Sequence, residues 1–454
     1  MSENTRFYHA TKIGNDDVIL FHTLTFSYLI LKGAEFSHWL GAGHDKLGKS
    51  LNAELVKKHF IASAEKDAGL FKKALEIFSK RKQRAPSICA YITTECNMRC
   101  PYCFQGSGDS HLTLNAADIA LIRDSVKQIQ ERRGRVRPVI FGGEPLLEKN
   151  RHIFSGMMEA FAGISTYPVE IVTNGTMLRK FMPEIKRYED SIDVLRFTVY
   201  GPSGINDRHR FADKGNKKNF QDNMRNIREV LSETRKIKIF LNLLLDNRTV
   251  AHVPELMAEL RQEGVLDSDR VIPLFGRIQF RCSLLKGDKY PHELKYADYY
   301  PELVKLLKAR VIPPGSISGS EVELLWKIFT GWESGACAAP NFKGCRAVYP
   351  GRYCFYPDGF IYPCTEIAGC KGNAIGEFRP GLRFFESMDA WENYPEVFLR
   401  ECAECKYIGM CNGACPATNI GDSGRLDRVT CINYKDSLDK FFTELDRSGM
   451  LKNV

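Results

Sequence analysis

The sequence lacks the features of an exported or membrane-spanning protein. No stretch approaches the roughly 18 uninterrupted apolar residues of a membrane-spanning helix. Residues 1–20 hold acidic and polar residues where a signal peptide has an apolar segment. Internal repeats, low-complexity tracts and nucleic-acid-binding motifs are also missing, and the net charge of +9 is a modest excess for 454 residues. We therefore expect a cytoplasmic protein of two or three domains, without nucleic-acid or membrane partners.

Cysteine, in contrast, is abundant. The chain has 15 cysteines, and all but Cys89 and Cys282 fall within two groups, Cys96–Cys103 and Cys337–Cys431. In a reducing compartment, such grouping favours metal binding over disulfides. The two isolated cysteines are expected to be small buried residues.

The first cysteine group offers three thiols and no obvious fourth. Cys96, Cys100 and Cys103 are spaced C-x3-C-x2-C, with Tyr102 before the last of them. A structural zinc site has four protein ligands, and ordinary iron–sulfur clusters take four thiolates. Three thiolates on one short loop leave one iron open for a substrate or cofactor. A zinc loop that borrows a distant fourth ligand is the alternative.

Strands and helices alternate between Ser87 and Phe280. The expected strands are Ile88–Thr93, Val136–Phe141, Glu170–Thr173, Val194–Val199, Ile237–Leu244 and Arg277–Phe280. Expected helices include Ala116–Gln130, Asn219–Ser232 and Val253–Gln262. Six such units predict an α/β fold with a partial (β/α)6 barrel, because a full eight-unit barrel takes about 250 residues. Functional groups should then follow the carboxyl ends of the strands.

Polar residues and glycines do follow several of these strands. They are Gly142, Gly143 and Glu144 after the second strand, Thr173 and Asn174 at the end of the third, Arg210 after the fourth and Asn242 on the fifth. Glycines allow close backbone approach, and an arginine can bind a carboxylate with two hydrogen bonds. Plain turns, a surface arginine and a structural hydrogen bond are the alternatives.

The second cysteine group has a more specific spacing. Cys345 is followed by Gly359 and Cys364, then by Cys402-x2-Cys405-x5-Cys411-x3-Cys415 and finally by Cys431. A hairpin is expected from strands 353–355 and 360–362 around Pro357-Asp358-Gly359. It brings Cys354 near Cys364, although a one-residue change of register would separate them. Cys337 and Cys370 are rivals of Cys354, and a zinc ribbon is the alternative for the group.

The remaining segments complete a four-part division of the chain. Residues 1–85 read as a small α+β unit, with strands within Asp17–Lys32 and helices around Leu51–His59 and Asp67–Lys80. A break at Pro313-Pro314 opens a bridge, and a closing helix lies between Cys431 and Gly449. The expected divisions are 1–85, 86–312, 313–344 and 345–454.

The two cysteine groups together resemble the radical S-adenosylmethionine (SAM) peptide maturases that carry a SPASM domain. The resemblance implies three 4Fe-4S clusters. Cys96, Cys100 and Cys103 would hold the SAM-binding cluster; Cys345, Cys364, Cys415 and, as our choice of fourth ligand, Cys354 would hold one auxiliary cluster; Cys402, Cys405, Cys411 and Cys431 would hold the other. SAM would contact Tyr102, Gly142, Gly143, Glu144, Thr173, Asn174, Arg210 and Asn242.

The resemblance also implies a reaction. A 5′-deoxyadenosyl radical would take a hydrogen from a precursor peptide, and the peptide would form a thioether or carbon–carbon crosslink. Residues 1–85 look like a winged-helix module that binds a leader sequence, and flavodoxin or ferredoxin would supply electrons. Alternatives are sulfatase-maturase-like oxidation of a Cys or Ser residue on a protein, maturation of a small cofactor, and a non-enzymatic electron carrier.

One position departs from the family pattern. Many relatives have Ser-x-Asp-Gly at the end of the fourth strand, whereas this chain has Thr198-Val199-Tyr200-Gly201. In sulfatase-maturing relatives an acidic residue in this region is linked to substrate deprotonation. Tyr200 is the candidate catalytic residue here, although a tyrosine has a much higher intrinsic pKa than an aspartate.

Overall fold

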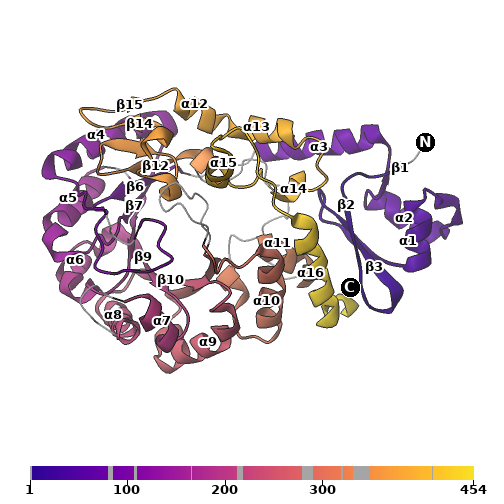
Figure 1. Ribbon diagram of the computed structural model, residues 1–454, viewed down its shortest axis with the longest axis horizontal. Helices are drawn as coiled ribbons and strands as arrows, with labels where there is room; N and C mark the ends of the chain where they lie inside the picture. Colours follow the sequence, from indigo (N-terminus) through magenta and orange to yellow (C-terminus); the bar gives the residue numbers. More distant parts are fainter. Residues whose placement is uncertain are drawn as a thin grey trace.

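The computed structural model describes residues 3–79, 85–106, 110–164, 166–211, 218–278, 290–317, 321–330, 345, 347–411 and 413–453. Its largest feature is a curved ten-stranded sheet with helices on its outer side, and a smaller N-terminal unit lies at one end of the molecule (Figure 1). No helix in these ranges is long and apolar enough to span a membrane.

Six parallel strands form the barrel part of the sheet, in sequence order. They are β6 (Ser87–Tyr91), β7 (Arg137–Phe141), β8 (Val169–Thr173), β9 (Ile192–Val199), β10 (Lys238–Leu245) and β11 (Val271–Arg277). The helices on the outer side include α4 (Ala116–Arg133), α5 (Arg151–Ala162), α6 (Met182–Arg187), α8 (Asn219–Glu233), α9 (Val253–Gln262) and α10 (Tyr296–Lys308). The predicted partial barrel is confirmed.

The sixth strand was predicted wrongly as Arg277–Phe280. It is β11, which ends at Arg277; residues 279 and 280 lie outside the described residues. Pro273 and Gly276 obscure the strand in the sequence, because both residues are rare in strand interiors. β11 is the outer strand of the sheet and pairs with β10, so the missing N–H of Pro273 can face the unpaired edge.

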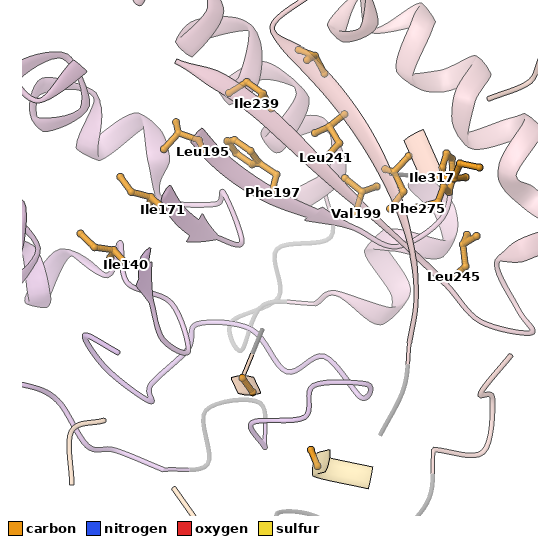
Figure 2. Packing of buried hydrophobic residues seen from close by; sticks show 14 of the residues in the cluster. Ile140, Ile171, Leu195, Phe197, Val199, Ile239, Leu241, Leu245, Phe275 and Ile317 are labelled. Carbon is orange, nitrogen blue, oxygen red and sulfur yellow. The ribbon is translucent and has the colours of Figure 1, made fainter. Parts of the chain in front are cut away.

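The alternation of side chains along the strands separates the core from the cavity. Phe197 and Val199 of β9 are buried among apolar side chains of the neighbouring strands, as are Leu241 and Leu245 of β10 (Figure 2). Thr198, between the two β9 residues, points to the opposite face because successive strand residues alternate. Packing of the core side chains therefore fixes the position of the side chains that face the cavity.

The C-terminal strands continue the same sheet. β12 (Arg352–Phe355) pairs in parallel with β6, and β13 (Phe360–Tyr362), β14 (Gly376–Glu377) and β15 (Arg383–Phe384) follow in antiparallel order. The predicted hairpin is confirmed. The remaining α-helices outside the N-terminal unit are α7 (Ser203–His209), α11 (Glu321–Thr330), α12 (Ser387–Glu392), α13 (Tyr394–Glu401), α14 (Ile408–Cys411), α15 (Pro416–Ser423) and α16 (Tyr434–Arg447). Thus no break in the sheet separates 86–312 from 345–454.

The N-terminal unit contains a three-stranded antiparallel sheet of β2 (Tyr8–Lys12), β3 (Asp17–His22) and β4 (Tyr28–Lys32). Short strands β1 (Glu3–Asn4) and β5 (Ile61–Ala62) and helices α1 (Gly33–Leu40), α2 (Lys49–Lys57) and α3 (Ala64–Ser79) complete it. The sequence predicted β3 and β4 but missed β2, which has no apolar run.

This unit packs on the C-terminal helix rather than hanging from a linker. The ring of Phe21 lies 5.5 Å from that of Phe442 in α16 and 6.3 Å from that of Phe329 in α11. All three side chains are buried in the main hydrophobic core. Figure 1 shows α16 between the barrel and the N-terminal sheet.

Candidate metal centre and cofactor cavity

A cavity of about 310 Å³ lies at the carboxyl ends of the barrel strands. Its volume is at the lower end of the range for small-molecule sites, roughly 300–1,000 Å³. The lining residues come from the loop after β6 and from the strand ends: Cys96, Met98, Cys100, Tyr102, Cys103, Phe104, Gln105, Phe141, Gly142, Gly143, Val172, Thr173, Asn174, Thr198, Arg210, Asn242, Leu244, Arg277, Ile278 and Glu366. All three predicted cysteines of the first group therefore face one cavity.

The cysteine loop is tied to the strand ends by hydrogen bonds. The Asn174 side chain donates to Asn97 Oδ1 at 2.8 Å and lies 3.7 Å from Cys96 Sγ. The N–H of Met98 lies 3.4 Å from the same sulfur. Burial, followed by the charge of Glu144, raises the pKa of Cys96 to about 12. A thiol in this position ionises when a cation binds it, as in a metal centre.

The donor set fits an iron–sulfur cluster with one open iron. A cluster binds each thiolate to a different iron, so it needs three sulfurs around one cavity, which the loop supplies. Among the described residues, no trio of His, Cys, Asp or Glu side chains is arranged around a single metal ion.

The glycines at the end of β7 make room for the protein's own backbone. A Cβ atom on Gly143 would lie 2.2 Å from the carbonyl oxygen of Glu95 and 2.5 Å from that of Thr94. The N–H of Gly143 donates to Thr93 O at 2.8 Å. Gly142 and Gly143 also line the cavity, and because they have no side chains, a ligand can approach their backbone closely.

Glu144 is fully buried and is not among the lining residues. Its Oε1 accepts hydrogen bonds from the Thr173 hydroxyl at 2.7 Å and from the Leu146 N–H at 2.9 Å, and its Oε2 accepts from the Asn174 N–H at 2.6 Å. Burial raises its pKa despite these bonds. The carboxylate therefore positions Thr173 and Asn174, which do line the cavity.

Two arginines give the cavity a positive side. Arg210 is 3% exposed, and its guanidinium donates to the Tyr102 hydroxyl at 3.0 Å, while its Nε has no hydrogen-bond partner among the described residues. Arg277 lies 3.7 Å from the ring centroid of Tyr296 and was not selected from the sequence. Its place at the end of β11 was hidden by the misplaced strand. Desolvated guanidinium groups suit a carboxylate ligand.

Asn242 and Tyr200 differ in how they relate to the cavity. Asn242 lines it, and its Oδ1 accepts a hydrogen bond from Arg196 at 3.2 Å. Tyr200 is fully buried and is not a lining residue; its hydroxyl donates to Asp246 Oδ2 at 2.5 Å. Burial and then this hydrogen bond raise the pKa of Tyr200, so it holds its proton. The position suits support of the site rather than contact with a ligand.

A second cavity, of about 280 Å³, contains three cysteines of the second group. Its lining residues are Cys345, Ala347, Arg352, Cys364, Thr365, Glu366, Trp391, Cys415, Pro416 and Ala417. Neither Cys354 nor Cys370 is among them, and Cys337 lies outside the described residues. Cys354 is instead opposite Cys89 in the β6–β12 pair and packs with Tyr91. Cys354 thus does not line the cavity of the three cysteines that it was expected to join.

The four remaining cysteines occupy one region next to the N-terminal unit. Cys402, Cys405 and Cys411 lie within one ten-residue segment, and Cys431 is close enough to Cys402 to affect its pKa. Burial raises the pKa of Cys402 to about 11 and that of Cys411 to about 12. These thiols, too, need a bound cation to ionise.

The loop of Cys402–Cys411 is held by residues that the sequence did not single out. The Thr23 hydroxyl donates to the carbonyl oxygen of Lys406, and His9 Nδ1 lies 3.0 Å from the Tyr407 hydroxyl. Arg6 and Glu404 form an ion pair at 2.5 Å. Such contacts span nearly 400 residues of sequence, so no local pattern could have predicted them.

Comparisons with known proteins agree with this geometry. Residues 90–260 match the model of the radical SAM superfamily. The serine-type anaerobic sulfatase-maturating enzyme of Klebsiella aerogenes is 22% identical over 375 residues, which cover 78% of this chain and 83% of that enzyme. A structure of anSMEcpe with bound AdoMet and Cp18Cys peptide superimposes with a TM-score of 0.58 and 18% identity, over 82% of this chain and 99% of that one.

A second solved structure covers more of the chain. Streptococcus suis SuiB bound to precursor peptide SuiA has a TM-score of 0.54 and 14% identity, over 94% of this chain and 98% of that one. The radical SAM family implies a 4Fe-4S cluster and SAM, and the first cavity has residues that fit both. The chain is therefore an enzyme that contains a radical SAM domain, at residues 90–260, and it has the fold of these two structures.

Proposed function

We propose that this enzyme modifies a ribosomally made precursor peptide, forming a thioether or a carbon–carbon crosslink. The supporting observation is that Glu366 lines both cysteine-containing cavities. A peptide side chain next to Glu366 would be within reach of a radical formed in the first cavity and of an electron acceptor in the second.

The proposed cofactors are three 4Fe-4S clusters and SAM. Cys96, Cys100 and Cys103 would hold the first cluster, and the second cavity and the Cys402–Cys431 region would hold one auxiliary cluster each. Bound there and reduced by one electron, the first cluster and SAM would supply a 5′-deoxyadenosyl radical for removal of a hydrogen atom from the substrate.

The chain's own residues would bind and orient SAM. Arg210 and Arg277 offer cations for its carboxylate, and the backbone at Gly142 and Gly143 allows close approach. Thr173, Asn174, Thr198 and Asn242 offer hydrogen-bonding groups for the ribose. Phe141, Leu244 and Ile278 are apolar, so they exclude water from the reactive centre.

The N-terminal unit favours a precursor peptide with a leader as the substrate. The SuiB structure covers 94% of this chain, so it matches most of residues 1–85 as well as the barrel. That structure holds the precursor peptide SuiA. We propose that residues 1–85 bind the leader and that flavodoxin or ferredoxin supplies the electron.

Oxidation of one Cys or Ser residue on a sulfatase-like protein is the second candidate. The similarity to the Klebsiella aerogenes enzyme over 78% of this chain favours it. The two candidates predict different products, since a crosslink joins two residues and the oxidation creates an aldehyde on one.

The test combines the enzyme with the peptides encoded beside its own coding sequence. Anaerobically reconstituted protein, SAM and dithionite should remove two hydrogens per crosslink, as measured by mass spectrometry. The product should resist a hydrazide reagent and give no fragment ions between the joined residues. The same peptide without its leader should react far more slowly. A hydrazide-reactive product would support the sulfatase-type reaction instead, and absence of 5′-deoxyadenosine would refute both.

A further inference from the structure

The second cavity contains a cation where a fourth cysteine was expected. Arg352 lines this cavity together with Cys345, Cys364 and Cys415. It lies on β12 two positions before Cys354, so the two side chains leave the strand on the same face. Arg352 reaches the cavity from this face, and Cys354 does not.

Cys354 has a different partner. It is fully buried and lies opposite Cys89 in the β6–β12 pair, and after burial the Cys89 thiol has the largest effect on its pKa. The electrostatic neighbours of Cys364, in contrast, are Glu366, Arg352, Cys345 and Cys415. Arg352 has neighbours in both groups, since Cys354, Cys364, Cys89 and Cys345 all act on its pKa. Tyr91 has neighbours in both groups too, but it does not line the cavity.

The guanidinium of Arg352 lacks a protein counter-ion within the described ranges. It makes no hydrogen bond and no ion pair with another described residue, although it is largely enclosed. A cation removed from water is costly unless a negative charge is close to it. The three thiols provide that charge only when they are ionised, and a metal cluster is what ionises buried thiols.

We propose that Arg352 is the counter-cation of the auxiliary cluster that Cys345, Cys364 and Cys415 hold, and that Cys354 is not a ligand of that cluster. The proposal rests on the proposed function, in which this cavity contains an iron–sulfur cluster. Arg352 is a positioning and tuning residue, not a catalytic one.

A nearby cation changes the reduction potential of a cluster in a predictable direction. The reduced cluster carries one more negative charge than the oxidised cluster, so a positive guanidinium stabilises the reduced form more. The potential of this cluster is therefore raised, since net charge and hydrogen bonds to sulfur are the main controls on cluster potentials. Loss of the cation must lower the potential of this cluster and leave the other clusters unchanged.

The test uses the full-length chain, reconstituted anaerobically with iron and sulfide and studied without peptide or SAM. The variants are Arg352→Gln, Arg352→Lys, Cys354→Ala and, as the matched control for a buried thiol, Cys89→Ala. Iron and acid-labile sulfide per chain report on ligation, and a redox titration followed by electron paramagnetic resonance reports on the potentials.

Cys354→Ala and Cys89→Ala should both retain the iron content of the wild type. Arg352→Gln should retain it too and should shift one cluster signal to lower potential, with a smaller shift in Arg352→Lys. Loss of one cluster's iron in Cys354→Ala but not in Cys89→Ala would overturn the ligand assignment. Unchanged potentials in iron-replete Arg352→Gln would overturn the role of Arg352. A wild-type iron content of only one cluster would instead refute the proposed cofactor set, and this inference with it.

Discussion

The ring of Tyr102 packs against the ring of Tyr200, with 4.6 Å between the centroids and 33° between the planes. Tyr102 belongs to the cysteine loop, whereas Tyr200 follows β9 and is fixed by Asp246. Asp246 Oδ2 also accepts a hydrogen bond from the Tyr290 hydroxyl at 2.5 Å. The position of the cysteine loop thus depends on buried Asp246, which fixes Tyr200 and, through the ring contact, Tyr102.

We expect Tyr200→Phe to lower the free energy of unfolding by about 1–3 kcal/mol, because buried Asp246 loses a hydrogen-bond donor. The ring contact with Tyr102 is kept, so 5′-deoxyadenosine should still form at a rate close to that of the wild type. Tyr200→Ala should lose both the hydrogen bond to Asp246 and the ring contact with Tyr102. Denaturant unfolding and quantification of 5′-deoxyadenosine check this. If iron-replete Tyr200→Phe formed no 5′-deoxyadenosine, Tyr200 would have a catalytic role after all.

Gly143→Ala should destabilise the protein by about 1–3 kcal/mol, because overpacking forces backbone shifts. The new methyl group would meet the backbone oxygens of Glu95 and Thr94, which cannot move without disturbing the cysteine loop. Gly276→Ala is the matched control, since nothing lies within 4 Å of its Cβ position. Thermal unfolding and SAM-binding titrations of both variants measure the effect. Equal behaviour of the two variants would contradict the close approach at Gly143.

Glu366→Gln should uncouple SAM cleavage from peptide modification. Glu366 is the single carboxylate among the described residues that line the first cavity. A lost hydrogen bond to a charged group corresponds to a decrease of about tenfold or more in modified peptide per 5′-deoxyadenosine. The same change at Glu377, which pairs with Arg383 away from both cavities, should leave this ratio unchanged. An unchanged ratio in Glu366→Gln would show that the peptide substrate does not contact Glu366.

Attachment of the N-terminal unit should weaken in mild acid. Burial lowers the pKa of His9 to about 4, against an ordinary value of 6.5, although Asp439 partly opposes the shift. Below pH 6.5 the unfolded chain binds a proton that the folded chain does not, so stability falls as the pH falls toward 4. The loss is about 1.4 kcal/mol at pH 5.5 for His9 alone.

Unfolding of the wild type and of His9→Gln at pH 7.5 and pH 5.5 checks this expectation. The variant should show a smaller decrease in stability between the two pH values. Part of the decrease should remain, because burial also lowers the pKa of His22, to about 3. Identical pH dependence in both proteins would mean that His9 is not held neutral in the folded state.

Deletion of residues 1–85 should lower the iron content as well as prevent peptide modification. The deletion removes Thr23 and His9 from the Cys402–Cys411 loop and exposes the buried ring of Phe442. Iron per chain and circular dichroism of the truncated protein measure the effect. A truncated chain with full iron content and unchanged melting would show that the unit is an independent module.

Local patterns were sufficient for the barrel and for the three cysteines of the first loop. The helix Val253–Gln262 was predicted with its observed ends, because its apolar residues recur at helical spacing and Pro254 lies in its first turn. Cys96 to Cys103 face one cavity because they share a single short loop. Neither feature depends on contacts between distant parts of the chain.

The errors at β2 and β11 have local causes, whereas the position of Cys354 depends on distant contacts. The hairpin around Asp358 was predicted, but its pairing with β6, more than 260 residues earlier, was not. That pairing puts Cys354 opposite Cys89 and leaves Arg352 to reach the cavity. Arg352 and Cys354 lie on the same face of β12, so the alternation of side chains along the strand cannot predict which of them lines the cavity.

The continuity of the sheet from β6 through β12 to β13 has a mechanical consequence. The loop of the first cavity follows β6, and Cys364 of the second cavity follows β13, so both are borne by one hydrogen-bonded framework. A hinge between them would have to break a strand ladder. The distance between the two cysteine-lined cavities is therefore held constant by the sheet, and in the proposed function only the peptide has to move.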